Sequence, residues 1–298
     1  MPERSAGRTA PATEVIRRVG IVGRRHTQEA IRTAGELADW LRRRDVAVAV
    51  DDSMRGAHLE ALGDFEVFDA GQRYDLVVVL GGDGTLLSVA RSVESGVPIL
   101  GVNLGRLGFL TEIGRHELYV SLVTILAGNY ELEQRSMFDV ELSRRGKLIH
   151  RYRAFNDAAI AKSVPSQIIE LELRVGANLI ANYRADGLII ATPNGSTAYN
   201  LSAGGPIVYP TLGVAMLTPI CPHSLTMRPI VVPDTEEMEV RLVSDLLEVM
   251  LTVDGQEGQV MAPRDVVSVK RSEQVVQLVR LRDRTFYDSL RNKLKWGG

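Results

Sequence analysis

An aspartate within a glycine-rich turn is a combination of residues that can act on phosphates. The turn runs Gly81, Gly82, Asp83, Gly84 and Thr85, between an apolar run at residues 76–80 and a helix-like segment at residues 86–93. Such a strand–turn–helix suits bound phosphate, because the helix start offers unpaired N–H groups and glycines let the backbone approach the anion. A carboxylate repels phosphate, so Asp83 indicates a proton to remove or a metal to hold. The alternative is a tight turn in which Asp83 caps the helix.

Two further polar clusters interrupt a largely apolar pattern. Asn156 and Asp157 follow Phe155, where such a pair can either bind sugar hydroxyls or form a turn. Residues 183–206 surround the short apolar run 188–191 with Gly, Ser, Thr and Asn. These residues expose the N–H and hydroxyl groups that phosphates and ribose require, so we favour a functional loop over a linker.

The composition sets outer limits on the protein. Its 298 residues suggest about two domains, and 35 basic against 37 acidic residues do not indicate a nucleic-acid surface. Cys221 is the only cysteine, so no intrachain disulfide is possible and a reducing compartment is expected. No apolar run approaches the length of a membrane helix, and residues 1–14 are predicted to form a disordered leader without a signal sequence. We therefore expect a cytoplasmic protein.

The first part of the chain alternates predicted strands and helices. Strands are predicted at residues 19–23, 46–50, 76–80 and 97–102, and helices at residues 27–44 and 117–127. Alternation of this kind predicts an open parallel sheet with helices on both faces. Ligands bind beyond the carboxyl ends of such strands, so the turn at residues 81–85 and the loop at residues 103–108 are expected at that edge.

The period then changes to two-residue alternation, which indicates antiparallel strands with one wet face. The alternation covers residues 137–143, 169–175, 238–242 and 247–253. We predict an α/β domain over residues 15–128 and a β-rich, sandwich-like domain over residues 129–270. Residues 271–298 are predicted to form a strand and a helix that return to the first domain.

Four stretches in a fixed order resemble the NAD kinase family of the bacterial type. They are GGDGT at residues 81–85, Asn156-Asp157, DGLIIATPNGSTAYNLSAGGP at residues 186–206 and CPHSLTMRPIVVP at residues 221–233. GVNLGRLGF at residues 101–109 and Asp254-Gly255-Gln256 also agree, so the resemblance covers residues 19–296. GGDGT alone is shared with phosphofructokinases and lipid kinases, whereas the glycine- and serine-rich segment is more specific. The resemblance implies an α/β domain plus a β-sandwich-like domain, assembled as a homodimer or homotetramer.

The resemblance also implies a reaction and a set of site residues. The γ-phosphoryl group of ATP would pass to the 2′-hydroxyl of the adenosine ribose of NAD, giving NADP, with Asp83 as proton acceptor and Mg²⁺ or another divalent metal on the ATP phosphates. Gly81, Gly82, Gly84 and Thr85 would contact phosphate. The implied NAD contacts are Asp83, Gly84, Asn156, Asp157, Arg184, Asp186, Thr197, Ala198, Tyr199, Asn200, Leu201, Ser202 and Gln256, with His223 as a further candidate. The chain departs from the family where many members have Glu in place of Asp157 and Thr in place of Asn194.

Two other functions remain open on sequence alone. A lipid or sphingoid kinase would share GGDGT but would need an apolar acceptor pocket or a basic amphipathic helix, and the sequence offers no such helix. A nucleotide sensor would keep the glycine-rich segments but would have no use for Asp83. Activity towards NAD, lipid or neither acceptor separates the three functions.

Overall fold

The computed structural model describes residues 15–56, 64–105, 108–163, 168–245, 248–282 and 284–296. The predicted leader at residues 1–14 lies outside this range, as do Arg106, Leu107 and Asp283. The chain divides into two compact units. The first unit contains residues up to Arg135 and from Val276 onwards, and the second contains residues 136–275.

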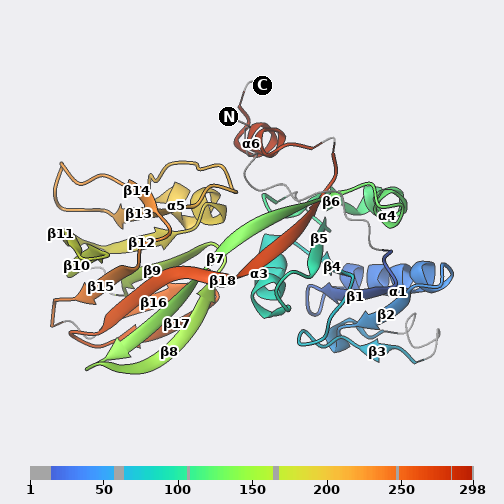
Figure 1. Ribbon diagram of the computed structural model, residues 1–298, viewed down its shortest axis with the longest axis horizontal. Helices are drawn as coiled ribbons and strands as arrows, with labels where there is room; N and C mark the ends of the chain where they lie inside the picture. The colour runs from blue at the N-terminus through green and yellow to red at the C-terminus, as the bar shows by residue number, and fades with distance from the viewer. Residues whose placement is uncertain are drawn as a thin grey trace. The chain divides into compact units, whose positions relative to one another are not determined.

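A parallel sheet forms the centre of the first unit (Figure 1). Its strands lie in the order β5-β4-β1-β2-β3, with bounds β1 Arg18–Gly23, β2 Ala47–Val50, β3 Glu66–Val67, β4 Leu76–Leu80 and β5 Pro98–Asn103. The short β6, Ile113–Gly114, and the end of β18, Val266–Arg280, also pair in parallel with β5. The chain moves outwards from β1 to β3 and returns on the other side of β1 with β4. The sheet therefore reverses its order between β1 and β4, and ligands bind at such switch points.

Helices cover both faces of this sheet. They are α1 Gln28–Arg42, α3 Asp83–Ser92 and α4 Leu118–Leu126. The unit also contains α6 Phe286–Leu294 and the short 3-10 turns η1 Asp52–Met54 and η2 Arg115–Glu117. Leu76, Val78 and Leu80 of β4 share one apolar core with α1 and α4. Since successive strand residues point to opposite faces, Val77 and Val79 face the other side, where α3 contacts β4 and β5.

The helix α3 begins earlier than its sequence predicts. The sequence predicts a helix from residue 86, with Gly84 and Thr85 in the preceding turn. In the structure Asp83 is already helical and Gly82 is the N-cap, with extended backbone angles. The turn is therefore only Gly81 and Gly82, and Asp83 lies on the first turn of the helix.

The second unit consists of two antiparallel sheets around a shared core. One sheet has the order β14-β13-β12-β9-β16-β17, with bounds β9 Asp157–Lys162, β12 Gly187–Ala191, β13 Val214–Ile220, β14 Ile230–Pro233, β16 Val249–Val253 and β17 Glu257–Met261. The other contains β7 Glu131–Arg144, β8 Lys147–Ala154, β10 Ile169–Val175, β11 Asn178–Ala185, β15 Met238–Leu242 and part of β18. Side chains from both sheets, such as Phe138, Leu171, Leu188 and Leu251, form one buried cluster. The predicted sandwich-like arrangement is confirmed.

A short polar segment follows β12 in this unit. It forms the 3-10 turn η3, Asn194–Thr197, and the one-turn helix α5, Tyr199–Ser202. Across the described ranges, none of the helices has the length and apolar character needed to cross a membrane.

Candidate active site

Asp83 is held in one orientation by the loop that follows β5. Its Oδ2 accepts the backbone N–H of Phe109 at 2.8 Å, and its Oδ1 accepts those of Leu110 and Thr111 at 3.2 and 3.3 Å. The N-cap of α3 is Gly82 and not Asp83. The alternative in which Asp83 serves as the helix cap is therefore wrong, and the Asp83 carboxylate reaches across to the neighbouring loop.

The loop that holds Asp83 is shaped to receive the carboxylate. A Cβ atom at Gly108 would collide with both carboxylate oxygens of Asp83. The Thr111 hydroxyl accepts hydrogen bonds from the Asn103 side chain at 3.1 Å and from the Gly108 N–H at 3.0 Å, which closes the loop on itself. The glycine and these contacts allow three consecutive N–H groups to converge on one side chain.

A pocket of about 610 Å³ lies on the opposite side of the α3 start. Gly82, Gly84 and Thr85 line it from the turn, and Val22 and Gly23 line it from the end of β1. The pocket thus occupies the switch point between β1 and β4, with the positive end of α3 at its wall. One turn therefore presents an anion-binding surface on its β1 side and an acid on its β5 side.

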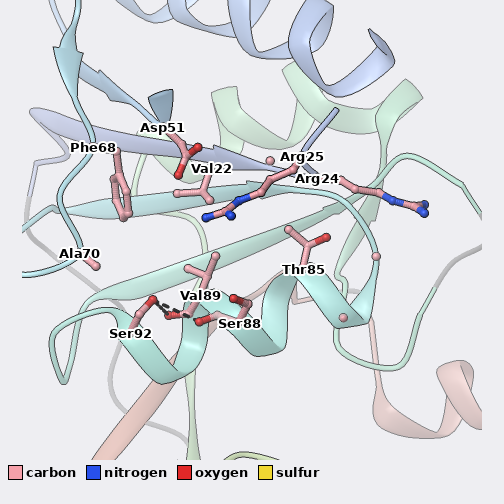
Figure 2. Close-up of a pocket in the computed structure, with 13 residues that line it drawn as sticks. Val22, Arg24, Arg25, Asp51, Phe68, Ala70, Thr85, Ser88, Val89 and Ser92 are labelled. Atoms are coloured by element: carbon pink, nitrogen blue, oxygen red, sulfur yellow. Dashed lines mark hydrogen bonds between the residues drawn. The ribbon is translucent and has the colours of Figure 1, made fainter. Parts of the chain in front are cut away.

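Two arginines that the sequence reasoning missed also line this pocket. Arg24 and Arg25 follow β1 directly, and in the described residues neither guanidinium has a hydrogen-bond or ion-pair partner. Figure 2 shows the Arg25 side chain extending over the pocket towards α3, whereas that of Arg24 points away. The signal in the sequence was the pair of basic residues at the carboxyl end of the first strand.

In the second unit, the ends of three neighbouring interior strands, β12, β9 and β16, meet on one side of the six-stranded sheet. Asp157 begins β9 and pairs with Ala191 at the end of β12, while Val253 at the end of β16 pairs with Ala158. Asp254 follows β16, and its carboxylate accepts the backbone N–H groups of Phe155, Asn156 and Asp157 at 3.0, 2.7 and 3.0 Å. Asp254 therefore fixes the segment that carries the predicted Asn-Asp pair.

Asn156 and Asp157 are buried polar residues, one with an acceptor atom that lacks a donor and one with a raised pKa. Among the described residues, no donor reaches the buried Oδ1 of Asn156. Burial, and then the charge of Asp254, raise the pKa of Asp157 to about 7. A buried acceptor without a donor is unfavourable, and a ligand hydroxyl could satisfy it. This is the chemistry expected of a sugar-binding position.

The segment after β12 is held by buried side chains. Thr192 Oγ1 donates to the Phe155 carbonyl at 2.6 Å, and Asn194 Nδ2 donates to the carbonyls of Ser136 and Phe155 at 3.0 and 3.2 Å. Asn200 has no exposed surface; its amide donates to Pro206 and its oxygen accepts from Thr218 at 2.6 Å. Thr192, Asn194 and Asn200 thus set the shape of the segment from within.

The remaining residues of this segment present side chains near its surface. Tyr199 is 44% exposed, and its pKa is raised by burial and then by the charges of Asp157, Cys221 and Asp186. Thr197, Ala198 and Leu201 are half-buried and Ser202 is exposed. Tyr199 therefore lies near the charges of both Asp157 and Asp186.

The other predicted contacts lie at the opposite end of β12. Asp186 precedes Gly187 and pairs with Lys162 at 2.6 Å, while Arg184 pairs with Glu170 at 3.2 Å. This end lies roughly 13 Å along the strand from Ala191, at about 3.3 Å per residue. The exposed His223 lies at this same end of β12, where its backbone N–H donates to the Arg184 carbonyl. The exposed Gln256 lies instead beside Asp254.

The described residues contain no complete set of side-chain ligands for a divalent metal. Within the ranges that the structure describes, no group of three His, Cys, Asp or Glu side chains is placed to hold one. In kinase sites Mg²⁺ uses one or two carboxylates with substrate phosphates and water.

Comparisons with known proteins agree on one family. Residues 19–130 match the family model of the ATP-NAD kinase N-terminal domain, and residues 155–281 match that of the ATP-NAD kinase C-terminal domain. The chain is 43% identical over 280 residues to an NAD kinase of Heliobacterium modesticaldum, covering 94% of this chain and 99% of that one. It is 42% identical over 287 residues to an NAD kinase of Syntrophotalea carbinolica, covering 95% and 99%.

Two solved structures share the fold. An NAD kinase from Archaeoglobus fulgidus in complex with ATP has a TM-score of 0.71 at 26% identity and covers 94% of this chain and 100% of its own. A yeast NADH kinase complexed with NADH has a TM-score of 0.87 at 24% identity and covers 98% and 94%. At that identity the yeast protein supports the fold alone.

Proposed function

The chain belongs to the ATP-NAD kinase family, and on this premise we propose how its residues act. The reaction transfers the γ-phosphoryl group of ATP to the 2′-hydroxyl of the adenosine ribose of NAD. Asp83 is the general base that accepts the hydroxyl proton as the new P–O bond forms. The observation that carries this assignment is the fixed Asp83 carboxylate on a turn whose other side lines an anion-binding pocket.

ATP binds in the pocket at the switch point of the first unit. The N–H groups at the start of α3 and the Arg25 guanidinium supply positive charge to the phosphates. Gly82, Gly84 and Thr85 form the wall closest to them, and the buried Gly81 shapes the turn behind that wall. A divalent metal, Mg²⁺ or another, neutralises phosphate charge when it is bound with ATP.

NAD binds to the second unit. Asn156 and Asp157 receive the ribose hydroxyls, because Asn156 Oδ1 is a buried acceptor without a donor among the residues that the structure describes. Tyr199 offers an exposed ring for stacking on a base, and its sequence neighbours Thr197, Ala198, Leu201 and Ser202 are further contacts. Arg184, Asp186 and Gln256 are further contacts, His223 is a weaker candidate, and Asn200 acts from within by holding the segment.

An acceptor panel tests the proposal. Purified protein with ATP and Mg²⁺ is given NAD, NADH or diacylglycerol in vesicles, and the phosphorylated products are quantified. We expect NADP from NAD and no product from the lipid. Binding of NAD without phosphoryl transfer would instead support a nucleotide sensor, and lipid phosphorylation would support a lipid kinase.

Assembly and location complete the proposal. We propose a homodimer or homotetramer in the cytoplasm, supported by the family resemblance and by the single cysteine, Cys221. Light scattering coupled to size-exclusion chromatography measures the assembly directly, and a monomer at assay concentration would exclude it.

A further inference from the structure

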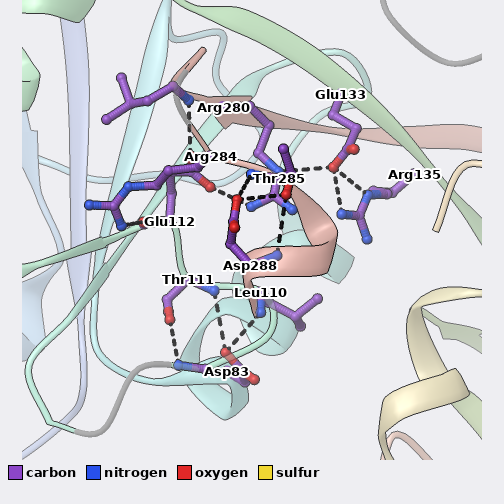
Figure 3. Close-up of polar contacts among 12 residues, drawn as sticks. Asp83, Leu110, Thr111, Glu112, Glu133, Arg135, Arg280, Arg284, Thr285 and Asp288 are labelled. Carbon is purple, nitrogen blue, oxygen red and sulfur yellow. Dashed lines mark hydrogen bonds and ion pairs between the residues drawn. The ribbon is translucent and has the colours of Figure 1, made fainter. Parts of the chain in front are cut away.

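The loop that holds Asp83 is itself fixed by a buried acid. Phe109, Leu110 and Thr111, which donate to Asp83, lead directly to Glu112. Glu112 is only 3% exposed. Its carboxylate accepts hydrogen bonds from the Arg280 guanidinium and from the Leu281 N–H, the latter at 2.9 Å. Figure 3 shows Asp83, this loop and the arginine in one view.

Arg280 belongs to a buried cluster of alternating charges. Its Nε donates to Glu133 Oε1 at 3.0 Å, and Arg135 Nε donates to the same oxygen at 3.0 Å. Burial opposes ionisation of Glu133, but Arg135 and Arg280 outweigh that effect and hold the pKa of Glu133 below its usual value. The side chains of Arg280 and Arg135 are 14% and 2% exposed. Each carboxylate in the cluster therefore has a guanidinium partner.

The chain after β18 holds Glu112 by both its side chain and its backbone. Arg284 donates from Nη1 to the Glu112 carbonyl at 2.6 Å and from Nη2 to the carboxylate of Glu117. Lys293 of α6 lies 6.0 Å from the centre of the Phe109 ring. Leu281 and Arg284 thus bind one end of the short loop whose N–H groups orient Asp83.

Buried charged clusters are not an efficient way to gain stability, since apolar residues of similar volume often do as well or better. They do impose fixed directions on the groups that they join. A small displacement of a reacting group can reduce the rate by about 10²-fold, so a rigid mount for Asp83 has a catalytic consequence.

We propose that Glu112 and Arg280 are positioning residues for Asp83. Together they fix the segment of residues 109–111, and through its three N–H groups they fix the direction of the Asp83 carboxylate. This inference rests on the proposed function, because it is the role of Asp83 as general base that makes its orientation matter for the rate.

The test introduces Glu112→Gln into the full chain with and without Asp83→Asn. In the otherwise unchanged enzyme we expect kcat to fall by about 10- to 100-fold, with the KM values for ATP and NAD within about twofold. Glu112→Asp, which keeps the charge, should restore part of kcat. In the Asp83→Asn background the Glu112→Gln substitution should have no further effect on kcat, because its target is already absent. An equal fold-loss in both backgrounds, or no loss in the otherwise unchanged enzyme, would overturn the proposal.

Hydrogen exchange provides a readout that does not depend on activity. Glu112→Gln should speed exchange of the amides of Phe109, Leu110 and Thr111, and unchanged exchange would overturn the proposal even if the double variant is inactive.

Asp265→Asn is the matched control, because it removes the charge of a buried acid that Arg144 binds at 2.9 and 2.8 Å in the second unit. It should change neither the exchange of these three amides nor kcat by more than about twofold, since it lies outside the path to Asp83. If Asp83→Asn alone retains near-normal kcat, the proposed role of Asp83 fails, and the exchange data then decide the positioning claim separately.

Discussion

The ionisation of Asp157 links the buried Asn-Asp pair to pH. Its pKa is raised to about 7 by burial and by Asp254, so the free protein holds a proton there below pH 7. In the proposed NAD complex, ribose hydroxyls donate hydrogen bonds to the ionised carboxylate and therefore favour its charged form. NAD binding must then release that proton at low pH.

We therefore predict that NAD affinity falls as the pH falls below 7. The limiting slope is about tenfold in Kd per pH unit, the value for release of one proton on binding. Calorimetry of NAD binding without ATP measures this directly, and buffers with different ionisation enthalpies count the protons. Asp157→Asn should bind NAD with a flat pH profile, whereas the same slope in that variant would assign the titration to another group.

At the scale of single residues, the sequence identified the proposed reactive groups more readily than the residues that hold them in place. Asp83, Asn156 and Asp157 stand in short motifs, so their types and order identified them. The Asp254 carboxylate accepts backbone N–H groups that are 97–99 residues away. The Glu112 carboxylate accepts the Leu281 N–H, 169 residues away, and the Arg280 guanidinium. No local pattern encodes a partner of that kind.

At the scale of elements, the pocket beside α3 leads to a prediction for Arg25, whose side chain lines it. Its guanidinium extends over the pocket while that of Arg24 points away (Figure 2). Arg25→Ala should raise the KM for ATP by about tenfold, the effect of losing one charge-assisted hydrogen bond at an exposed position. The KM for NAD should stay unchanged, since Arg25 is not among the proposed NAD contacts and all of these except Asp83 and Gly84 belong to the second unit.

Arg24→Ala is the matched control for that experiment. It removes the same charge from the same loop, so a general electrostatic effect would appear in both variants. A clearly smaller rise in the KM for ATP is expected for Arg24→Ala. Equal effects of the two substitutions would contradict a direct contact between Arg25 and the nucleotide.

Element boundaries were predictable where burial follows a simple period. β4 spans the predicted residues because all five are apolar and buried. β7 was predicted only at residues 137–143, although it begins at Glu131. Its missed inward positions carry Glu133 and Arg135, which are buried by their mutual charges and not by apolar character. Apolar periodicity cannot detect a strand of that kind.

At the scale of the whole molecule, the change from helical to alternating period gave the fold class of both parts. The predicted boundaries at residues 128 and 270 differ from the unit limits at Arg135 and Val276, because β7 and β18 each contribute residues to both units. A long strand carries no break in pattern where it leaves one unit, so the exact limit is not written in the local sequence.

The division into two units makes binding and chemistry separable. The proposed NAD contacts other than Asp83 and Gly84 belong to the second unit, whereas the proposed base belongs to the first. A substitution of the base should therefore reduce the rate of phosphoryl transfer much more than the affinity for NAD.

The rate of phosphoryl transfer by Asp83→Asn, measured in a single turnover with NAD affinity determined in parallel, tests the central claim most directly. We predict a rate reduced by about 10²- to 10⁴-fold, the range for loss of a general base, with a Kd for NAD within about threefold of the unchanged protein. A near-normal rate in this variant would contradict the role of Asp83 as general base.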